Sequence, residues 1–129
     1  MKAYILMGST SDQPHGDKVA AGLTAEGIDS EFLAKSAHKD PIGVLEYVQE
    51  KSAESKVVFI TIAGRSNALS GVVAANTDKP VLACPPHKDK SDYMVNIHST
   101  LHMPSLTPVM CVIDPGNCAL AAARILKLS

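Results

Sequence analysis

The sequence contains no tryptophan, and aromatic residues make up only 4% of its 129 residues. A core with so few rings must be aliphatic, and the hydrophobic fraction of 46% is ordinary for a globular protein. A chain of this length buries about two thirds of its unfolded surface in one core. We therefore expect a single domain over residues 1–129.

No charge of one sign predominates, since 12 Lys and Arg stand against 13 Asp and Glu. This balance leaves no basic stripe for nucleic acid and no polybasic membrane anchor. The apolar run near the N-terminus has about five residues, which is too short for a signal peptide or a membrane-spanning helix. We expect a cytoplasmic protein that binds neither nucleic acid nor membrane and that holds any anion through local groups.

Other absences narrow the chemistry. The sequence has no Walker A or G-x-G-x-x-G motif, which argues against an ATP or dinucleotide site. Cys84, Cys111 and Cys118 form no Cys-x-x-Cys pair and are interpreted as reduced structural thiols, with a catalytic thiol as the alternative. His98 and His102 have a spacing that could ligate a metal, but the sequence places no third ligand. We expect no metal and no cofactor.

Short apolar runs rich in β-branched residues alternate with segments of helical periodicity. The predicted strands are residues 3–7, 30–34, 57–62, 81–84 and 109–113. The predicted helices are residues 14–26, 41–54, 66–75, 91–101 and 116–126. Gly27 is the expected C-cap of the first helix and Asp40 the N-cap of the second. The last helix is apolar nearly all round, which predicts that it packs on two partners.

The alternation of strands and helices predicts the fold class. Strands that are apolar on both faces indicate a parallel sheet covered by helices on each side. We expect a flavodoxin-like three-layer α/β/α sandwich with a five-stranded sheet of order 2-1-3-4-5. Such sheets bind ligands at the carboxyl ends of the strands beside the switch point, which lies here at the ends of the first and third strands.

Directly after the first predicted strand, Gly8-Ser9-Thr10-Ser11-Asp12 leads into a helix. Glycine permits a tight turn, and hydroxyl and backbone N–H groups at a helix start suit a phosphate. Asp12 would repel a phosphate, so we interpret it as a helix cap or as an acceptor for sugar hydroxyls beside the phosphate. The pattern is typical of a ribose phosphate site or of a purely structural turn.

Two further loops carry groups suited to catalysis or binding. After the second strand, His38 could transfer a proton and Lys39 could hold a phosphate or carboxylate, although a lone loop histidine is usually only solvated. After the third strand, Arg65 lies between small residues and precedes Ser66 and Asn67, which is a local pattern for anion and amide recognition. A surface arginine without a role is the alternative.

Six motifs occur in one order along the chain: GSTSD at 8–12, SAHK at 36–39, AGRSNALSG at 63–71, ACPP at 83–86, HMPSLTPV at 102–109 and NCALAAARIL at 117–126. In this order and spacing, the sequence resembles the phosphoribosylaminoimidazole carboxylase family (AIR carboxylase, PurE-like) over nearly its whole length. Each motif alone is weak, but six in register are specific. The resemblance implies an enzyme of purine (IMP) biosynthesis that needs no metal, nucleotide or biotin.

The family has two branches. One moves a carboxylate of N5-carboxyaminoimidazole ribonucleotide from nitrogen to ring carbon 4, and the other adds carbon dioxide directly to 5-aminoimidazole ribonucleotide. The mutase branch typically has SAHR and a loop like AGGAAHLPG, whereas the direct carboxylases have SAHK and AGRSN. Lys39 and residues 65–67 make this sequence similar to the direct, class II carboxylases.

Carried over position by position, the resemblance implies the roles of the site residues. The implied substrate-binding positions are Gly8, Ser9, Ser11, Asp12, Ser36, Gly64, Arg65, Ser66 and Asn67. Ser9, Ser11 and Asp12 would hold the ribose phosphate, with Asp12 on the ribose hydroxyls. His38 would transfer the proton at ring carbon 4, and Lys39 with residues 64–67 would stabilise the developing carboxylate.

Two departures from the family pattern concern the second half of the chain. The direct carboxylases usually have Arg where this chain has His102, so one phosphate-side contact is expected to differ. Family members commonly continue into a further C-terminal helix that packs in an octamer with active sites between subunits. We expect this chain to lack that helix and to form a homo-oligomer, with an octamer as the implied state.

Three alternatives stay open at this point. The nearest is the mutase, which has the same fold and a different substrate. A non-enzymatic flavodoxin-like module is a second, although a receiver domain would need an Asp at the end of the third strand. A homologue that binds the nucleotide without turnover is the third.

Overall fold

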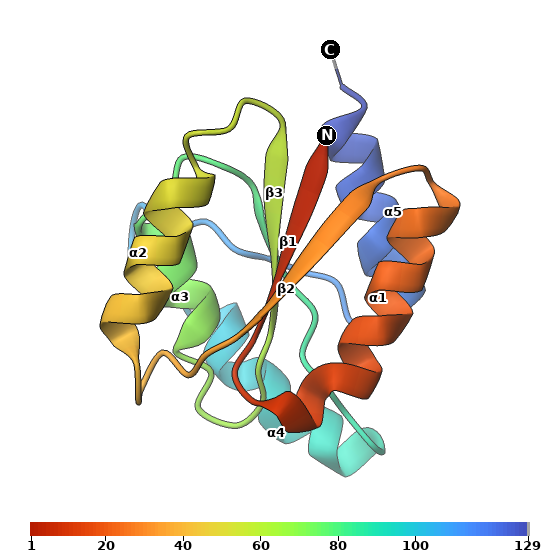
Figure 1. Ribbon diagram of the computed structural model, residues 1–129. Helices are drawn as coiled ribbons and strands as arrows, with labels where there is room; N and C mark the ends of the chain where they lie inside the picture. The colour runs from red at the N-terminus through yellow and green to blue at the C-terminus, as the bar shows by residue number, and fades with distance from the viewer. Residues whose placement is uncertain (129) are drawn as a thin grey trace.

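The computed structural model describes residues 1–128, in which parallel strands alternate with helices (Figure 1). The strands are β1 (Lys2–Met7), β2 (Asp29–Ala34), β3 (Val57–Ile62), β4 (Val81–Ala83) and β5 (Met110–Cys111). The helices are the short 3-10 turn η1 (Thr10–Asp12), α1 (Gln13–Ala25), α2 (Pro41–Lys51), α3 (Leu69–Ala75), α4 (Lys90–Leu101) and α5 (Pro115–Leu126).

The sheet has the order β2-β1-β3-β4-β5 with every pair parallel, which confirms the predicted flavodoxin-like topology. Met7 is in register with Ala34 on one side and with Ile62 on the other. The last residues of β1, β2 and β3 therefore lie level with one another. The three loops that follow these strands leave the sheet at the same edge, which is the lower edge in Figure 1.

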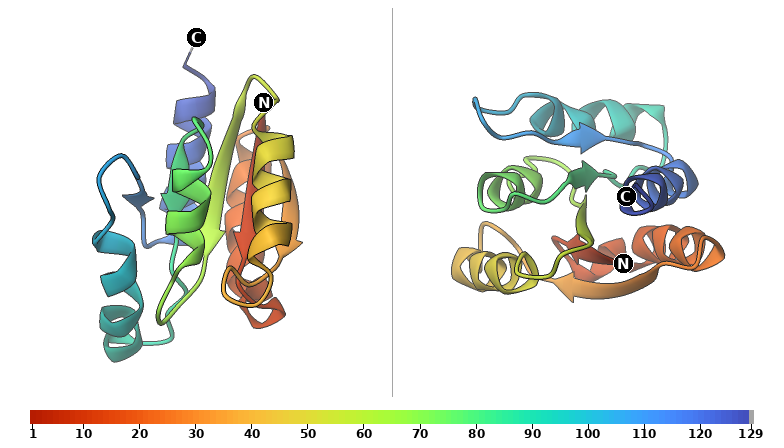
Figure 2. Two further views of the ribbon diagram at one scale, coloured as in Figure 1. Left: turned by 90° about the vertical axis from the view of Figure 1, so that its left-hand side faces the viewer. Right: turned by 90° about the horizontal axis from the view of Figure 1, so that it is seen from above.

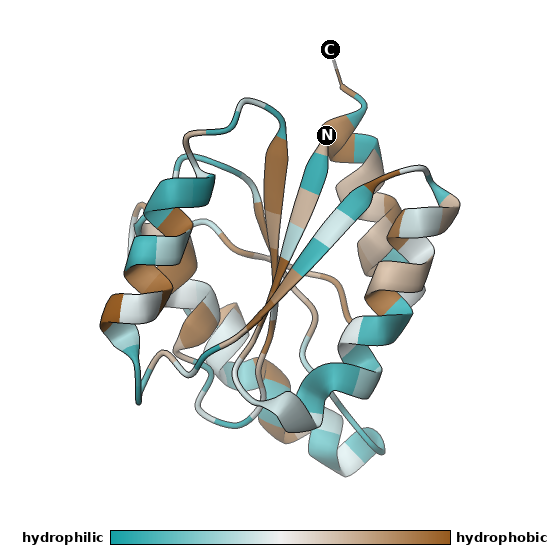
Figure 3. Cartoon of the chain, viewed as in Figure 1, coloured by the Kyte–Doolittle hydropathy of each residue, from teal (hydrophilic) through white to brown (hydrophobic). Residues whose placement is uncertain are grey.

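Helices cover both faces of the sheet, with α1 and α5 on one face and α2 and α3 on the other (Figure 2). Each pair encloses a core against the central strands, and every residue of β3 is buried. The expectation of an aliphatic core holds for most of these residues, but the rings of Tyr4 and Phe59 are also fully buried, on the side of α2 and α3. The strand β2 departs from the expectation of strands apolar on both faces, because none of its residues is fully buried. Polar residues can be accommodated there since β2 is an edge strand, and Figure 3 shows the contrast with β3.

Local predictions about helix ends and packing are confirmed. Gly27 follows α1 with a left-handed φ of 73°, and Asp40 Oδ1 accepts the N–H of Gly43 at 3.0 Å as the N-cap of α2. The apolar helix α5 packs on both α1 and β3. It is a core helix of 12 residues, and none of the helices within residues 1–128 has the length and apolarity to cross a bilayer.

Three elements are each three residues shorter than predicted. The third helix begins at Leu69 instead of 66, because Asn67 Oδ1 accepts the N–H of Ser70 and the chain before it bends. The fifth strand covers only residues 110–111, since its neighbour β4 has only three residues with which it can pair. The second helix also ends earlier, at Lys51.

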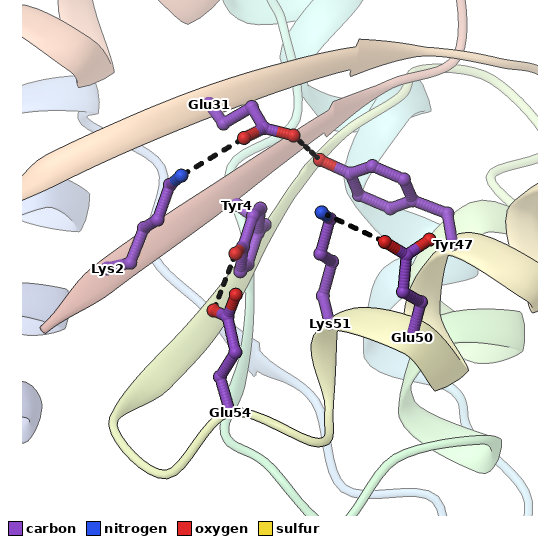
Figure 4. Close-up of polar contacts among 7 residues, drawn as sticks. All are labelled: Lys2, Tyr4, Glu31, Tyr47, Glu50, Lys51 and Glu54. Atoms are coloured by element: carbon purple, nitrogen blue, oxygen red, sulfur yellow. Dashed lines mark hydrogen bonds and ion pairs between the residues drawn. The ribbon is translucent and has the colours of Figure 1, made fainter.

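Two tyrosines make hydrogen bonds to carboxylates beside the amino-terminal part of the sheet (Figure 4). Tyr4 is fully buried and donates to Glu54 at 2.5 Å, while Tyr47 donates to Glu31 at 3.0 Å. Lys2 pairs with the other oxygen of Glu31 at 3.0 Å. Burial and these carboxylates raise the pKa of both tyrosines, so the rings stay neutral donors. We interpret the cluster as structural.

Candidate active site

The loops after β1, β2 and β3 enclose a cavity of about 190 Å³. Its walls bring together eight of the predicted site residues: Gly8, Ser9, Asp12, Ser36, His38, Gly64, Ser66 and Asn67. These residues come from three segments separated by more than twenty positions in the chain, and the common register of the strands places them side by side. Small alanine side chains and Leu69 complete the wall.

A larger cavity of about 570 Å³ adjoins the first, and the two share Asp12 and Gly64 as wall residues. The predicted residues Ser11 and Arg65 line this second cavity. Pro86, which belongs to the ACPP motif at 83–86, also lines it, and sequence reasoning did not single out the other wall residues, which are Pro14, His15, Lys18, His87, Lys88, Asp92 and Asn96. Three of its side chains are basic (Lys18, Arg65 and Lys88) and two are acidic, so the cavity is suited to an anionic group.

The first loop is tied to the sheet and places one carboxylate at the cavity wall. Gly8 donates its N–H to Ile62 O at 3.0 Å, and Ser9 Oγ accepts the N–H of Ser11 at 3.2 Å. Asp12 stands at the N-cap position of α1 but makes no side-chain capping bond. Burial raises the pKa of the Asp12 carboxyl, as expected for a half-buried acid at a cavity wall. The structure does not support the interpretation of Asp12 as a helix cap, and its role as an acceptor for a ligand stays a prediction.

The second loop is a turn organised by one hydroxyl. Ser36 Oγ accepts the backbone N–H groups of His38 and Lys39, each at 3.2 Å. The turn places His38 in the wall of the smaller cavity. Lys39 is exposed and lines neither cavity, so the structure does not bring it together with the other predicted site residues.

The third loop divides its side chains between the two cavities. Arg65 lines the larger cavity and Ser66 the smaller one. Asn67 is 5% exposed, and its amide donates to Thr100 Oγ1 at 3.0 Å while accepting from Ser70 N. The side chain of Asn67 is therefore committed to holding the loop and the start of α3, and Ser66 is the freer polar group.

The alternative of a catalytic thiol does not fit the structure. Cys84 and Cys118 are fully buried, and no cysteine lines either cavity. A hydrogen bond with Cys118, together with burial, raises the pKa of the Cys84 thiol and disfavours its reactive thiolate.

The histidine pair considered for a metal is not on one helix, because α4 ends at Leu101 and His102 follows with extended backbone. Within the described residues 1–128, the structure contains no group of three His, Cys, Asp or Glu side chains that could hold a metal ion.

The residues that sequence reasoning missed lie in two places. His87 and Lys88 lie in the loop that follows β4, so the rule that ligands bind at the carboxyl ends of strands could have indicated them. His15 and Lys18 lie in the first turns of α1, where the sequence pattern of an ordinary amphipathic helix gave no signal. Only the packing of α1 beside the loop after β4 shows that they face one cavity.

The model of one protein family, described as AIR carboxylase, matches residues 2–129. The chain belongs to the AIR carboxylase family. The match includes all three site loops, so the cavities described above are those of an AIR carboxylase domain.

Individual relatives agree with this assignment. A phosphoribosylaminoimidazole carboxylase of Archaeoglobus fulgidus is 50% identical over 128 residues, covering 99% of this chain and 70% of that protein. A bifunctional phosphoribosylaminoimidazole carboxylase/succinocarboxamide synthetase of Drosophila melanogaster is 44% identical, covering 96% of this chain and 29% of that longer protein. The crystal structure of Treponema denticola PurE superposes with a TM-score of 0.90 at 42% identity, covering 96% of this chain and 78% of that one.

Proposed function

We propose that this AIR carboxylase adds carbon dioxide to ring carbon 4 of 5-aminoimidazole ribonucleotide, giving 4-carboxy-5-aminoimidazole ribonucleotide in purine biosynthesis. The observation that carries the proposal is the smaller cavity, in whose wall His38 lies with seven further predicted site residues. The printed names of the Archaeoglobus and Treponema relatives, phosphoribosylaminoimidazole carboxylase, support the same reaction.

The two adjoining cavities suggest how a ribonucleotide is held. The imidazole base would occupy the smaller cavity beside His38, and the 5′-phosphate would extend into the larger one toward Ser11, Lys18 and Arg65. Asp12 lies in the wall common to both, where the ribose would cross. Its ionised carboxylate would accept hydrogen bonds from the ribose hydroxyls, and such charge-assisted bonds are stronger than neutral ones.

The chemistry then needs positioning and one proton transfer. The amino group makes ring carbon 4 an enamine-like nucleophile, which attacks carbon dioxide so that a carbon–carbon bond forms and the electron pair moves to the carboxylate oxygens. The imidazole of His38 would take the proton that leaves carbon 4 and restore the aromatic ring. Carbon dioxide is neutral and binds weakly, so the rate depends on holding the nucleotide in a reactive orientation.

The loops around the base would stabilise the carboxylate that forms on ring carbon 4. The hydroxyl of Ser66 and the backbone of Gly64 lie in the cavity wall and are the proposed donors. Lys39 follows His38 in the chain and is exposed, and we propose it as the mobile cationic contributor. The proposed reaction uses no metal and no cofactor.

The choice of carbon dioxide over the mutase reaction rests on the sequence of two loops. Lys39 and residues 65–67 resemble the direct carboxylases, whereas a mutase would have SAHR and a loop like AGGAAHLPG. The mutase, which shares the fold, is the alternative within the family. A domain that binds the nucleotide without turnover is the alternative outside enzyme function.

A pair of assays decides among these functions. We expect labelled carbon dioxide to be incorporated into 5-aminoimidazole ribonucleotide at low carbon dioxide and without ATP, faster than the N5-carboxylated nucleotide is converted in a parallel assay. Faster conversion of the N5-carboxylated nucleotide would make the protein a mutase. If neither assay shows turnover while calorimetry still shows nucleotide binding, the protein is a binding domain.

We further propose that the chain forms a cytoplasmic homo-octamer, as the family resemblance implies. Apolar side chains are exposed on α4, on the following loop and on β5, among them Leu101, Leu106 and Met110 at 58%, 97% and 43%. Apolar residues so exposed are typical of association surfaces. Light scattering should therefore give a mass near that of eight chains of 13.6 kDa each, and a mass of one chain would contradict the proposal.

A further inference from the structure

A row of three polar residues on α4 contacts the loop formed by residues 64–67. Asn96, Ser99 and Thr100 project from successive turns of the helix, and Asn96 and Thr100 are buried. Buried polar side chains need hydrogen-bond partners, and all three find them in this loop. The helix thereby serves as the support on which the third site loop rests.

Asn96 makes the central contacts and is 4% exposed. Its Oδ1 accepts the backbone N–H of Arg65 at 2.8 Å, and its Nδ2 donates to the carbonyl of Pro86 at 2.6 Å. One amide side chain therefore joins the loop after β3 to the loop after β4. Both loops contribute residues to the wall of the larger cavity.

The backbone held by Asn96 has a conformation that needs support. Arg65 has a φ of 59°, in the left-handed region that residues with a side chain adopt at a cost. Ser99 adds to the support, since its Oγ donates to Arg65 O at 2.8 Å and accepts from Asn67 N at 2.8 Å. A Cβ on Gly64 would lie 3.1 Å from the Asn96 amide, so helix and loop are in close contact.

We propose that Asn96 is a positioning residue for the carboxylation, acting through the backbone of Arg65. Its hydrogen bond holds the left-handed turn that directs Arg65 into the larger cavity while Ser66 remains in the wall of the smaller one. Neither the motifs of the site loops nor the assignment to the family identifies this residue. The inference rests on the proposed function for its kinetic consequence, whereas its structural consequence is independent of turnover.

Two substitutions separate positioning from mere stabilisation. Asn96→Ala removes both hydrogen bonds, and because loss of reactive geometry can cost up to about a hundredfold, we expect kcat/KM to fall at least tenfold. Asn96→Asp keeps an oxygen that accepts the Arg65 N–H. Its second carboxylate oxygen cannot donate to the carbonyl of Pro86 and repels it. This variant should be no more stable than Asn96→Ala to thermal unfolding, yet should retain kcat/KM within about threefold of wild type.

A control shows that the effect is specific to this site. Asn76 lies at the end of α3, where its amide donates to Val72 O at 2.7 Å, and it lines neither cavity. Asn76→Ala should leave turnover unchanged. The inference is overturned if Asn96→Ala keeps kcat/KM within twofold of wild type, or if Asn96→Asp loses as much as Asn96→Ala, because activity would then not depend on the acceptor.

Hydrogen–deuterium exchange of the unliganded proteins tests the same bond without any substrate. We expect peptides covering residues 64–70 to exchange faster in Asn96→Ala and at the wild-type rate in Asn96→Asp. If wild type shows no turnover in the paired assays, the proposed function fails, and this exchange measurement still decides whether Asn96 holds the loop. Unchanged exchange in Asn96→Ala would overturn the inference whatever the enzyme assays show.

Discussion

Substitution of His38 by asparagine is expected to lower kcat by about a hundredfold or more, the usual contribution of a general acid–base residue. Asparagine is similar in size and polarity but cannot take the proton from ring carbon 4. Affinity for 5-aminoimidazole ribonucleotide should stay within a few-fold, because in the proposed binding mode the first loop and the larger cavity would hold most of the nucleotide. Steady-state turnover and calorimetric titration of the nucleotide measure the two quantities on the same preparation.

A second histidine provides the matched control for this experiment. His98 is exposed on α4 and lines neither cavity, so His98→Asn should keep wild-type turnover. Retention of more than about a tenth of wild-type turnover in His38→Asn would be incompatible with a general acid–base role. Loss of nucleotide affinity in parallel with turnover would instead make His38 a binding residue.

Asp12→Asn is expected to weaken nucleotide binding by roughly tenfold to a hundredfold, which is the range for one charged hydrogen bond. The carboxylate lies in the wall shared by the two cavities and makes no capping bond with α1, so it is available for the ribose hydroxyls. The amide preserves shape and removes the charge. The dissociation constant of the nucleotide, measured by calorimetry, is the direct test.

The pH dependence of binding gives a second test of Asp12. Burial raises the pKa of its carboxyl, so in wild type the carboxylate is protonated as pH falls at a higher pH than for an ordinary aspartate. Affinity should therefore fall in that acidic range, and Asp12→Asn should remove this component of the dependence. The exposed Asp17, whose Oδ1 accepts from Gln13 at 2.7 Å, offers the control Asp17→Asn with wild-type affinity. Unchanged affinity in Asp12→Asn would exclude a ribose contact.

The site could be predicted in part because its residues follow strands. A residue at the carboxyl end of a parallel strand is placed by the topology alone, and Ser9, His38 and Ser66 meet as expected. Lys39 does not line the cavities, since the direction of an exposed side chain depends on local packing and not on its position in a motif. Asn67 was predicted as a recognition residue, but its side-chain amide donates a hydrogen bond to Thr100 and accepts one from the backbone N–H of Ser70.

The strand order, most helix boundaries and the three site loops could be predicted from the amino-acid sequence. These features depend on local periodicity, on caps such as Asp40 and on connection rules that act along the chain. Only the tertiary structure decided that His15, Lys18 and Lys88 share a cavity and that Asn96 supports the turn at Arg65. His15 and Lys88 are more than seventy positions apart and Arg65 and Asn96 are 31 apart. Contacts over such separations leave no periodic pattern in the sequence from which they could be predicted.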